Sequence, residues 1–334
     1  MIRVGVAGWD YPDWAGIVYP SRPPKGFDRL AFLGGFFDAV EINVTFYRKI
    51  DPKTSASWVN RAPPDRSFMF TAKLYQALTH ATTSSIALPG PRGAGRPSRI
   101  SGLADRTALV DLPSEARDYL TGIGPLLGAG RLGAVLMQFP QAFHDRPDNR
   151  RHVARLAGLL PGLPLVAEFR HRSWDDEGAL AFLKELGVGF CNIDQPSLGS
   201  TLPPTEHVTS RIAYIRLHGR NARNWFSREN RMGGAAAERS AGSARYDYYY
   251  SMAELRPWAD RARRMAKRAE EVFIIANNHY RGKGPANALM LKSALTSRRV
   301  RAPADLVAAY PDLKEVTEPV AIRAGRAPKQ GRLF

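Results

Sequence analysis

Cysteine is almost absent from this chain of 334 residues, whose single cysteine is Cys191. One thiol excludes an intramolecular disulfide and a metal site built from several cysteines. Because Cys191 lies inside a predicted strand, its expected role is packing in the core.

Long apolar runs are also absent. No stretch of about 18 or more apolar residues occurs, so we expect no membrane span. The N-terminal sequence MIRVGVAGWD enters a strand at once and lacks the charged-then-apolar layout of a signal peptide. A cytoplasmic protein is therefore expected.

Acidic residues are scarce relative to basic ones. The chain has 31 Asp and Glu against 48 Lys and Arg, a formal net charge of +17. A field of this sign favours polyanions such as nucleic acid, anionic membrane surfaces or phosphorylated substrates. A high-GC genome, which replaces Lys with Arg, would give the same excess without a functional reason. The expected partners are a phosphorylated small molecule or nucleic acid, and not a membrane.

Strand and helix patterns alternate along most of the chain. Strands are predicted at 3–8, 38–46, 68–74, 132–139, 164–169, 187–193, 212–218 and 271–277. Helices are predicted at 26–37, 52–62, 114–128, 148–160, 175–186, 252–269 and 284–296. Such alternation indicates a parallel sheet. Eight repeats, with no GxGxxG after the first strand, favour an α/β fold of the (β/α)8 TIM-barrel type over an open doubly wound sheet.

Three segments interrupt this rhythm. Residues 79–113 and 219–245 are rich in Gly and Arg and predict two long loops on the C-terminal face of the barrel. The connection at 195–211 is Pro-rich and without a helical pattern, so the barrel is expected to be irregular after the sixth strand. We therefore expect a single domain over 1–316, followed by a flexible basic tail over 317–334.

Several predicted strands end in a pair of polar residues at alternate positions. Glu41 and Asn43 end one strand, and the same spacing recurs at Glu168 and Arg170, at Asn192 and Asp194, and at Arg216 and His218. Alternate residues share one face of a strand. Since the C-terminal ends of barrel strands converge on the active site, these pairs predict a site there.

Motifs spread from residue 4 to about residue 295 carry a family resemblance. They are VGVAGWDYPDW with the following Tyr19-Pro20, VEINVTFYR at 40–48, F-x-F-x-x-K at 68–73, LMQFP at 136–140, EFRHRSW at 168–174, YIRLHGR at 214–220, RYDYYYS at 245–251, and NNH with the later ANAL at 286–289. Together they resemble the YecE-like proteins, the family of domain of unknown function 72. The resemblance implies a TIM-barrel-like fold and no settled activity. His279 stands where many relatives have Asp, and the segment 219–245 is longer than usual.

Paired carboxylates are the first candidates for chemistry. Glu41 and Glu168 lie on the second and fifth predicted strands, across the barrel mouth, where they could divide general acid and base work. Asp194 and His218 complete the expected catalytic set. Alternatively, each carboxylate neutralises a neighbouring cation in a buried network, and the sequence leaves both interpretations open.

Cations gather on the same predicted face, at Lys73, Arg170, Arg216 and Arg220. Their excess over nearby carboxylates suits an anion such as phosphate, unless the cations are paired with Glu41, Glu168 and Asp194.

His171, His218 and His279 could supply metal ligands. However, the chain lacks HxH and HExxH spacing and the nearby cations repel a metal, so no metal is expected, and the sequence indicates no cofactor.

Further residues predict a binding surface on this rim. The aromatic candidates are Trp9, Tyr47, Trp174 and Trp225, with Tyr246, Tyr248, Tyr249 and Tyr250 after the second long loop. The neutral hydrogen-bonding candidates are Asn43, Gln138, Asn192, Asn277 and Asn278, and His171 is added as a binding residue. Such a set suits a polyhydroxylated or phosphorylated ligand. Packing under the loops is the alternative role of the aromatic residues.

The chain ends in Gln330-Gly331-Arg332-Leu333-Phe334. Gln330, Leu333 and Phe334 resemble the short peptide by which bacterial replication and repair proteins dock on the sliding clamp. The hypothesis is that this motif tethers the protein to the clamp.

Three functions remain open from the sequence. The first is hydrolysis of phosphoester bonds in a phosphorylated or nucleic-acid substrate, with Glu41 or Glu168 as base and with Lys73, Arg170 and Arg216 holding the phosphate. The second is a glycosidase-like enzyme that uses the two glutamates. The third is a non-enzymatic adaptor that binds a nucleotide or nucleic acid.

Overall fold

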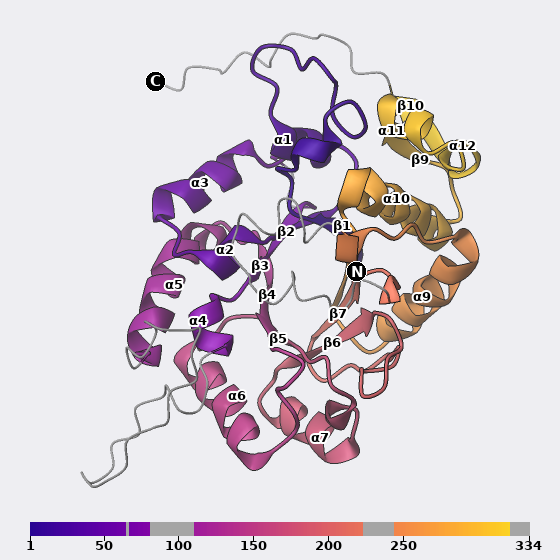
Figure 1. Cartoon of the computed structure of the whole chain (residues 1–334). Helices are drawn as coiled ribbons and strands as arrows, with labels where there is room; N and C mark the ends of the chain where they lie inside the picture. Colours follow the sequence, from indigo (N-terminus) through magenta and orange to yellow (C-terminus); the bar gives the residue numbers. More distant parts are fainter. Residues whose placement is uncertain (65–66, 81–109, 223–243, 321–334) are drawn as a thin grey trace, which may run out of the picture.

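Eight parallel strands close into a barrel in the computed structural model, which describes residues 1–64, 67–80, 110–222 and 244–320 (Figure 1). The strands are β1 Ile2–Ala7, β2 Ala39–Ile42, β3 Met69–Lys73, β4 Leu132–Gln138, β5 Leu165–Glu168, β6 Gly189–Asp194, β7 Ile212–Leu217 and β8 Glu271–Ala276. Each pairs with the next in sequence, and β8 pairs with β1 to complete the ring. The predicted TIM-barrel-like fold is confirmed.

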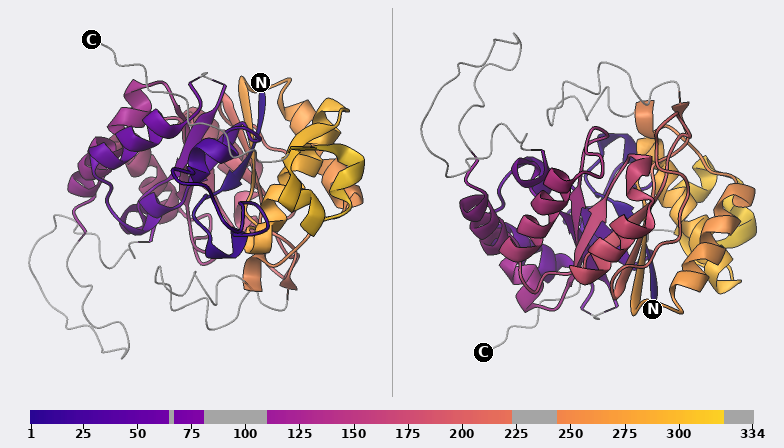
Figure 2. Two further views of the ribbon diagram at one scale, coloured as in Figure 1. Left: turned by 90° about the horizontal axis from the view of Figure 1, so that it is seen from above. Right: turned by 90° about the horizontal axis from the view of Figure 1, so that it is seen from below.

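Helices surround this barrel (Figure 1). They are α1 Arg29–Leu33, α2 Val44–Tyr47, α3 Pro52–Arg61, α4 Gln76–Thr79, α5 Leu112–Gly128, α6 Pro147–Leu159, α7 Glu177–Glu185, α9 Met252–Met265, α10 Lys283–Thr296, α11 Ala304–Ala309 and α12 Leu313–Val316. Figure 2 shows the strands side by side between helices on both flanks. No helix in the described part of the chain is long and apolar enough to cross a membrane.

Local sequence signals explain where the main helices begin. Asp51 precedes Pro52, and its carboxylate accepts a hydrogen bond from the backbone N–H of Lys53 at the start of α3. Ser251 and Glu254 form a reciprocal capping box at the start of α9. Because a strand leads into each outer helix, these caps help to set the point where the chain leaves the barrel mouth.

The second strand is shorter than its sequence pattern predicts. The apolar alternation extends to residue 46, but β2 ends at Ile42, and Asn43 has the helical backbone conformation that starts α2. The apolar residues beyond it belong to this single helical turn, which packs beside β3. Asn43 therefore lies at the turning point of the chain, at the mouth of the barrel.

The connection after β6 has no helix, as predicted from its proline content. Asn192 holds this segment by its side chain, which accepts from Thr205 Oγ1 at 2.8 Å and from the His207 N–H at 2.7 Å, and donates to the His207 carbonyl. These hydrogen bonds of a buried amide hold the segment against the barrel at a place where the other connections have a helix.

The C-terminal boundary predicted at residue 317 is wrong. Residues Thr317–Val320 form β10, which pairs in parallel with β9, Val300–Pro303, beside α10. Thr317 is fully buried, and its hydroxyl donates to the Leu313 carbonyl at 2.6 Å. The short polar segment is ordered because its backbone pairs with β9 and not because of apolar periodicity.

Several predicted features fall outside the described residues. These are most of the two long loops, at 81–109 and 223–243, with Trp225, and the segment 321–334 with Gln330, Leu333 and Phe334.

Candidate functional site

A pocket of about 870 Å³ opens at the C-terminal ends of β1, β2, β3 and β8. Trp9 follows β1, Asn43 follows β2, Lys73 ends β3 and Asn277 follows β8, and all four line the pocket. The pocket therefore lies where a barrel of this type places its active site. Tyr47, Tyr246 and His279 line it as well, so seven of the candidate residues meet here.

Aromatic rings form much of the wall. The edge of Trp9 meets the ring of Trp58 at a centroid distance of 5.6 Å. Tyr11 stacks on His279 at 4.3 Å, and Tyr246 lies 5.1 Å from the same imidazole. These rings give the pocket flat apolar surfaces beside its polar groups.

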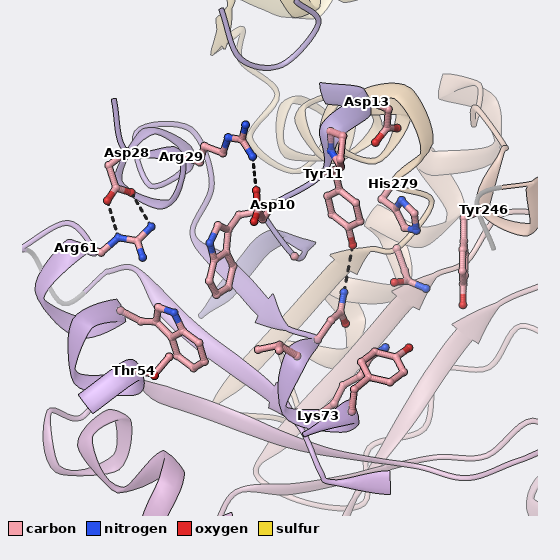
Figure 3. A pocket seen from close by; sticks show the side chains of 18 of the residues that line it. Asp10, Tyr11, Asp13, Asp28, Arg29, Thr54, Arg61, Lys73, Tyr246 and His279 are labelled. Atoms are coloured by element: carbon pink, nitrogen blue, oxygen red, sulfur yellow. Dashed lines mark hydrogen bonds and ion pairs between the residues drawn. The ribbon is translucent and has the colours of Figure 1, made fainter. Parts of the chain in front are cut away.

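Two ion pairs line another part of the wall. Asp10 pairs with Arg29, and Asp28 pairs with Arg61 at 2.5 Å. Figure 3 shows both pairs lying apart from Lys73. Their charges are satisfied within the wall, which leaves other groups to bind a charged ligand.

Lys73 differs from these paired cations of the pocket wall. Its side chain is buried, with 6% of the residue exposed, and its ammonium lies 5.7 Å from the ring centroid of Phe46. Within the described residues, no carboxylate lies within ion-pair distance of Lys73 and no hydrogen-bond acceptor contacts it. A buried ammonium without an anion is costly, so this position favours an anionic ligand.

Two buried polar atoms of the pocket residues also lack partners in the described part of the chain. They are Asn43 Oδ1 and His279 Nδ1. Burial, together with the smaller effect of the nearby charge of Lys73, lowers the pKa of His279 to about 3. His279 is therefore neutral at physiological pH and can accept a proton or a hydrogen bond.

Below the pocket, Arg216 joins the two glutamates that the sequence singled out. Its guanidinium donates to Glu41 Oε1 at 2.7 Å and to Glu168 Oε2, and all three residues are fully buried. Tyr214 donates to the second oxygen of Glu41 at 3.0 Å. Glu168 Oε1 accepts from Gln138 at 2.8 Å and from Arg170 at 2.9 Å.

This network gives the glutamates an electrostatic role. The guanidinium of Arg216, and not a gap for substrate or water, lies between Glu41 and Glu168. Although burial opposes ionisation, the charges of Arg216 and Arg170 hold the pKa of Glu168 well below its usual range. A carboxylate so stabilised is a weak base, and the spacing that a two-carboxylate glycosidase requires is occupied.

His218 connects this network to the pocket. Its Nε2 lies 3.4 Å from Glu168 Oε1, and its Nδ1 lies 2.9 Å from Asn277 Nδ2. Burial lowers the pKa of His218 to about 3, so the imidazole is neutral. Because Nε2 faces the ionised Glu168, the imidazole proton belongs on Nε2, and Nδ1 accepts from the amide N–H of Asn277.

The expectation that Asp194 would face the same cluster is wrong. Its carboxylate accepts from Trp258 at 2.6 Å, from Tyr250 at 2.9 Å and from Arg220 at 2.7 Å. Trp258 belongs to α9, so Asp194 faces the helix layer. The thiol of Cys191, whose pKa burial and the charge of Glu168 raise, faces the interior instead.

Other predicted residues have structural partners outside the pocket. Trp174 stacks on Phe169 at 3.8 Å in the core. His171 stacks on His144 at 3.8 Å. Asn278 donates to Asn287 Oδ1 and to the Tyr248 carbonyl. Gln138, Arg170 and Arg216 support Glu168 and do not line the pocket.

Sequence reasoning missed much of the pocket wall. The pocket residues it did not propose as binding groups include Asp10, Tyr11, Asp28, Arg29, Arg48, Trp58 and Arg61. The GWDYPDW motif after the first strand could have indicated Asp10 and Tyr11 as binding residues. Trp58 and Arg61 lie on an outer helix whose sequence has no feature that indicates a binding role. No group of three or more His, Cys, Asp or Glu side chains within the described residues could hold a metal ion.

Comparisons with known proteins agree with this architecture. The family model described as "Protein of unknown function DUF72" matches residues 3–309. The UPF0759 protein YunF of Bacillus subtilis (strain 168) is 25% identical over 302 residues, covering 88% of this chain and 95% of that protein. The crystal structure of a DUF72 family protein from Thermotoga maritima MSB8 is similar, with a TM-score of 0.69, 28% identity, and coverage of 89% of this chain and 99% of the other. A DUF72 family protein from Enterococcus faecalis V583 shares the fold at 23% identity and a TM-score of 0.68, over 89% and 96% of the two chains.

Arg216→Met tests the buried network. The substitution leaves the buried Glu41 without a cation and Glu168 with Arg170 alone, so we expect the free energy of unfolding to fall by about 3–5 kcal/mol. Urea denaturation measures this loss. The matched control Arg264→Met breaks the exposed pair with Glu206 and should cost far less, because solvent screens that pair. Equal effects of the two substitutions would contradict the assignment.

The depressed pKa of His218 predicts a pH dependence of stability. The unfolded histidine binds a proton below about pH 6.5, whereas the folded one binds it only near pH 3. Stability is therefore lost as the pH falls from about 6.5 toward 3. His218→Gln should reduce this slope by up to about 1.4 kcal/mol per pH unit in urea denaturation between pH 7 and pH 4. An unchanged slope would show that His218 is protonated in the folded protein.

Proposed function

The chain belongs to the DUF72 family of proteins of unknown function, and we propose that it binds a phosphorylated small molecule in the pocket at the barrel mouth and hydrolyses its phosphoester bond. The proposal depends mainly on Lys73, a buried residue of the pocket wall whose ammonium has no anionic partner among the described residues. A phosphate group supplies the missing charge and accepts the hydrogen bonds of the ammonium.

The surroundings of Lys73 support phosphate over a neutral ligand. Arg48 also lines the pocket, is exposed, and has no carboxylate partner in the described part of the chain. One buried and one exposed cation suit a group with two negative charges. The net charge of +17 adds a long-range attraction for anions.

Hydrolysis requires only water as a second reactant. The water oxygen bonds to phosphorus, the ester P–O bond breaks, and the departing oxygen takes a proton to become an alcohol. Lys73 stabilises the charge on the phosphoryl oxygens. The imidazole of His279, which lines the pocket, accepts the proton of the attacking water and releases it to solvent, from which the departing oxygen takes its proton. The negative charge of a bound phosphate offsets that of Lys73 and raises the pKa of His279, which makes it a better base.

Phosphate binding gives the first test. Millimolar phosphate at constant ionic strength should raise the melting temperature of the protein, because it binds only the folded state. Lys73→Met should abolish this rise, whereas Lys184→Met, which removes an exposed lysine from α7, should preserve it. A melting temperature indifferent to phosphate in the unsubstituted protein would refute the proposal.

His279→Gln tests the reaction. We expect the unsubstituted protein to release phosphate from members of a panel of phosphomonoesters, and the variant to lose about 100-fold or more in kcat. The stabilisation by inorganic phosphate should survive in the variant, because Lys73 remains. Full activity without the imidazole would assign the proton transfer to another group, and no activity on any ester would leave the pocket as a binding site.

A further inference from the structure

The amide of Asn43 has a fixed orientation. The single hydroxyl proton of Tyr11 is donated to the Ala7 carbonyl at 2.8 Å. The same oxygen must therefore accept from Asn43 Nδ2, which lies 3.2 Å away. This contact turns the other end of the amide, Oδ1, away from Tyr11. Asn43 Oδ1 is buried without a partner in the described residues, so it is a hydrogen-bond acceptor that still needs a donor.

The amide of Asn277 is oriented by the network below it. Asn277 Nδ2 donates to His218 Nδ1, and the opposite nitrogen of His218 faces the ionised Glu168. This fixes Nδ2 toward the barrel interior, which leaves Oδ1 as the polar atom that Asn277 offers to the pocket it lines. Nothing within the described ranges donates a hydrogen bond to that oxygen. The buried ion pairs thus determine that Asn277 presents a hydrogen-bond acceptor, and not a donor, to the pocket.

These groups follow one another around the barrel mouth. Asn277, Asn43 and Lys73 stand at the ends of β8, β2 and β3, with β1 between the first two. Neighbouring strands lie about 5 Å apart, so the two acceptor oxygens and the ammonium form an arc of small-molecule size. Trp9, which follows β1, adds a half-buried ring to the pocket wall, packed against Trp58.

We propose that the ligand is a polyhydroxylated phosphate ester, a sugar phosphate, with its phosphate on Lys73 and its hydroxyl groups donating to Asn43 Oδ1 and Asn277 Oδ1. This inference rests on the proposed phosphate site and adds the chemistry of the rest of the ligand. A ligand that covers these two acceptor oxygens must supply hydrogen-bond donors to them. Hydroxyls do so without adding a cation near Lys73, and the carbon face of a sugar ring packs against Trp9.

The experiment compares four ligands by calorimetric titration of the full chain. They are inorganic phosphate, pentyl phosphate, ribose 5-phosphate and phosphoethanolamine. Pentyl phosphate has the same five-carbon length as ribose 5-phosphate but no hydroxyls. Ribose 5-phosphate should bind at least about tenfold more tightly, because two neutral hydrogen bonds are gained and two buried acceptors are no longer left without donors. Phosphoethanolamine should bind no better than pentyl phosphate.

Variants test whether the amides of Asn43 and Asn277 cause the preference for ribose 5-phosphate over pentyl phosphate. Asn277→Leu and Asn43→Leu should each reduce the ratio of the pentyl phosphate Kd to the ribose 5-phosphate Kd by about threefold or more, and the double variant should bring it near one. The control Asn60→Leu, on the exposed face of α3, should leave the ratio unchanged.

The outcomes separate this inference from the proposed function. Binding of inorganic phosphate with no preference for ribose 5-phosphate over pentyl phosphate would overturn the sugar-phosphate assignment alone. A preference for phosphoethanolamine would also overturn it, since the acceptors would then bind an ammonium. If none of the four ligands binds, the phosphate site itself fails. A preference that survives the double variant would place the hydroxyl groups elsewhere.

Discussion

The fully buried ion pairs of Arg216 with Glu41 and Glu168 are the constraint on which the candidate site depends. Three ionised groups inside a barrel are tolerated only because each is held by its neighbours, and removing one leaves the others without compensation. Through Glu168 this network sets the tautomer of His218, and through His218 it sets the orientation of Asn277. The charges in the interior thereby define a neutral acceptor in the pocket without contacting the ligand.

The barrel thus separates two kinds of charged group. In the interior, carboxylates and guanidiniums are paired with one another. They therefore orient the residues of the pocket and do not bind a ligand themselves. At the mouth, Asp10 and Asp28 are paired with arginines, whereas Lys73 has no anion among the described residues. An unpaired buried cation at the end of a barrel strand is the feature that distinguishes a binding site from a stabilising network.

Much of the fold could be predicted from the sequence, because every strand of a closed parallel barrel repeats the same apolar pattern. The alternation also identified Glu41, Glu168 and Arg216 as interior residues. It failed at β6, where Asn192 and Asp194 share a face that meets Trp258 and the connection at 195–211 and not the interior. Alternation shows which residues of a strand share a face. It does not show which face is turned toward the barrel interior when both faces are buried and carry polar residues. Nor could it show that Arg216 lies between the glutamates, because that requires the distances between β2, β5 and β7 across the barrel.

The central claim is that Lys73 marks the position of a ligand phosphate. A crystal structure of the protein soaked with tungstate, a heavy analogue of phosphate, tests this most directly by its anomalous signal. The account predicts a peak in the pocket with an oxyanion oxygen about 3 Å from Lys73 Nζ. A pocket without tungstate, with the Lys73 ammonium bound to a carboxylate of the protein, would contradict it.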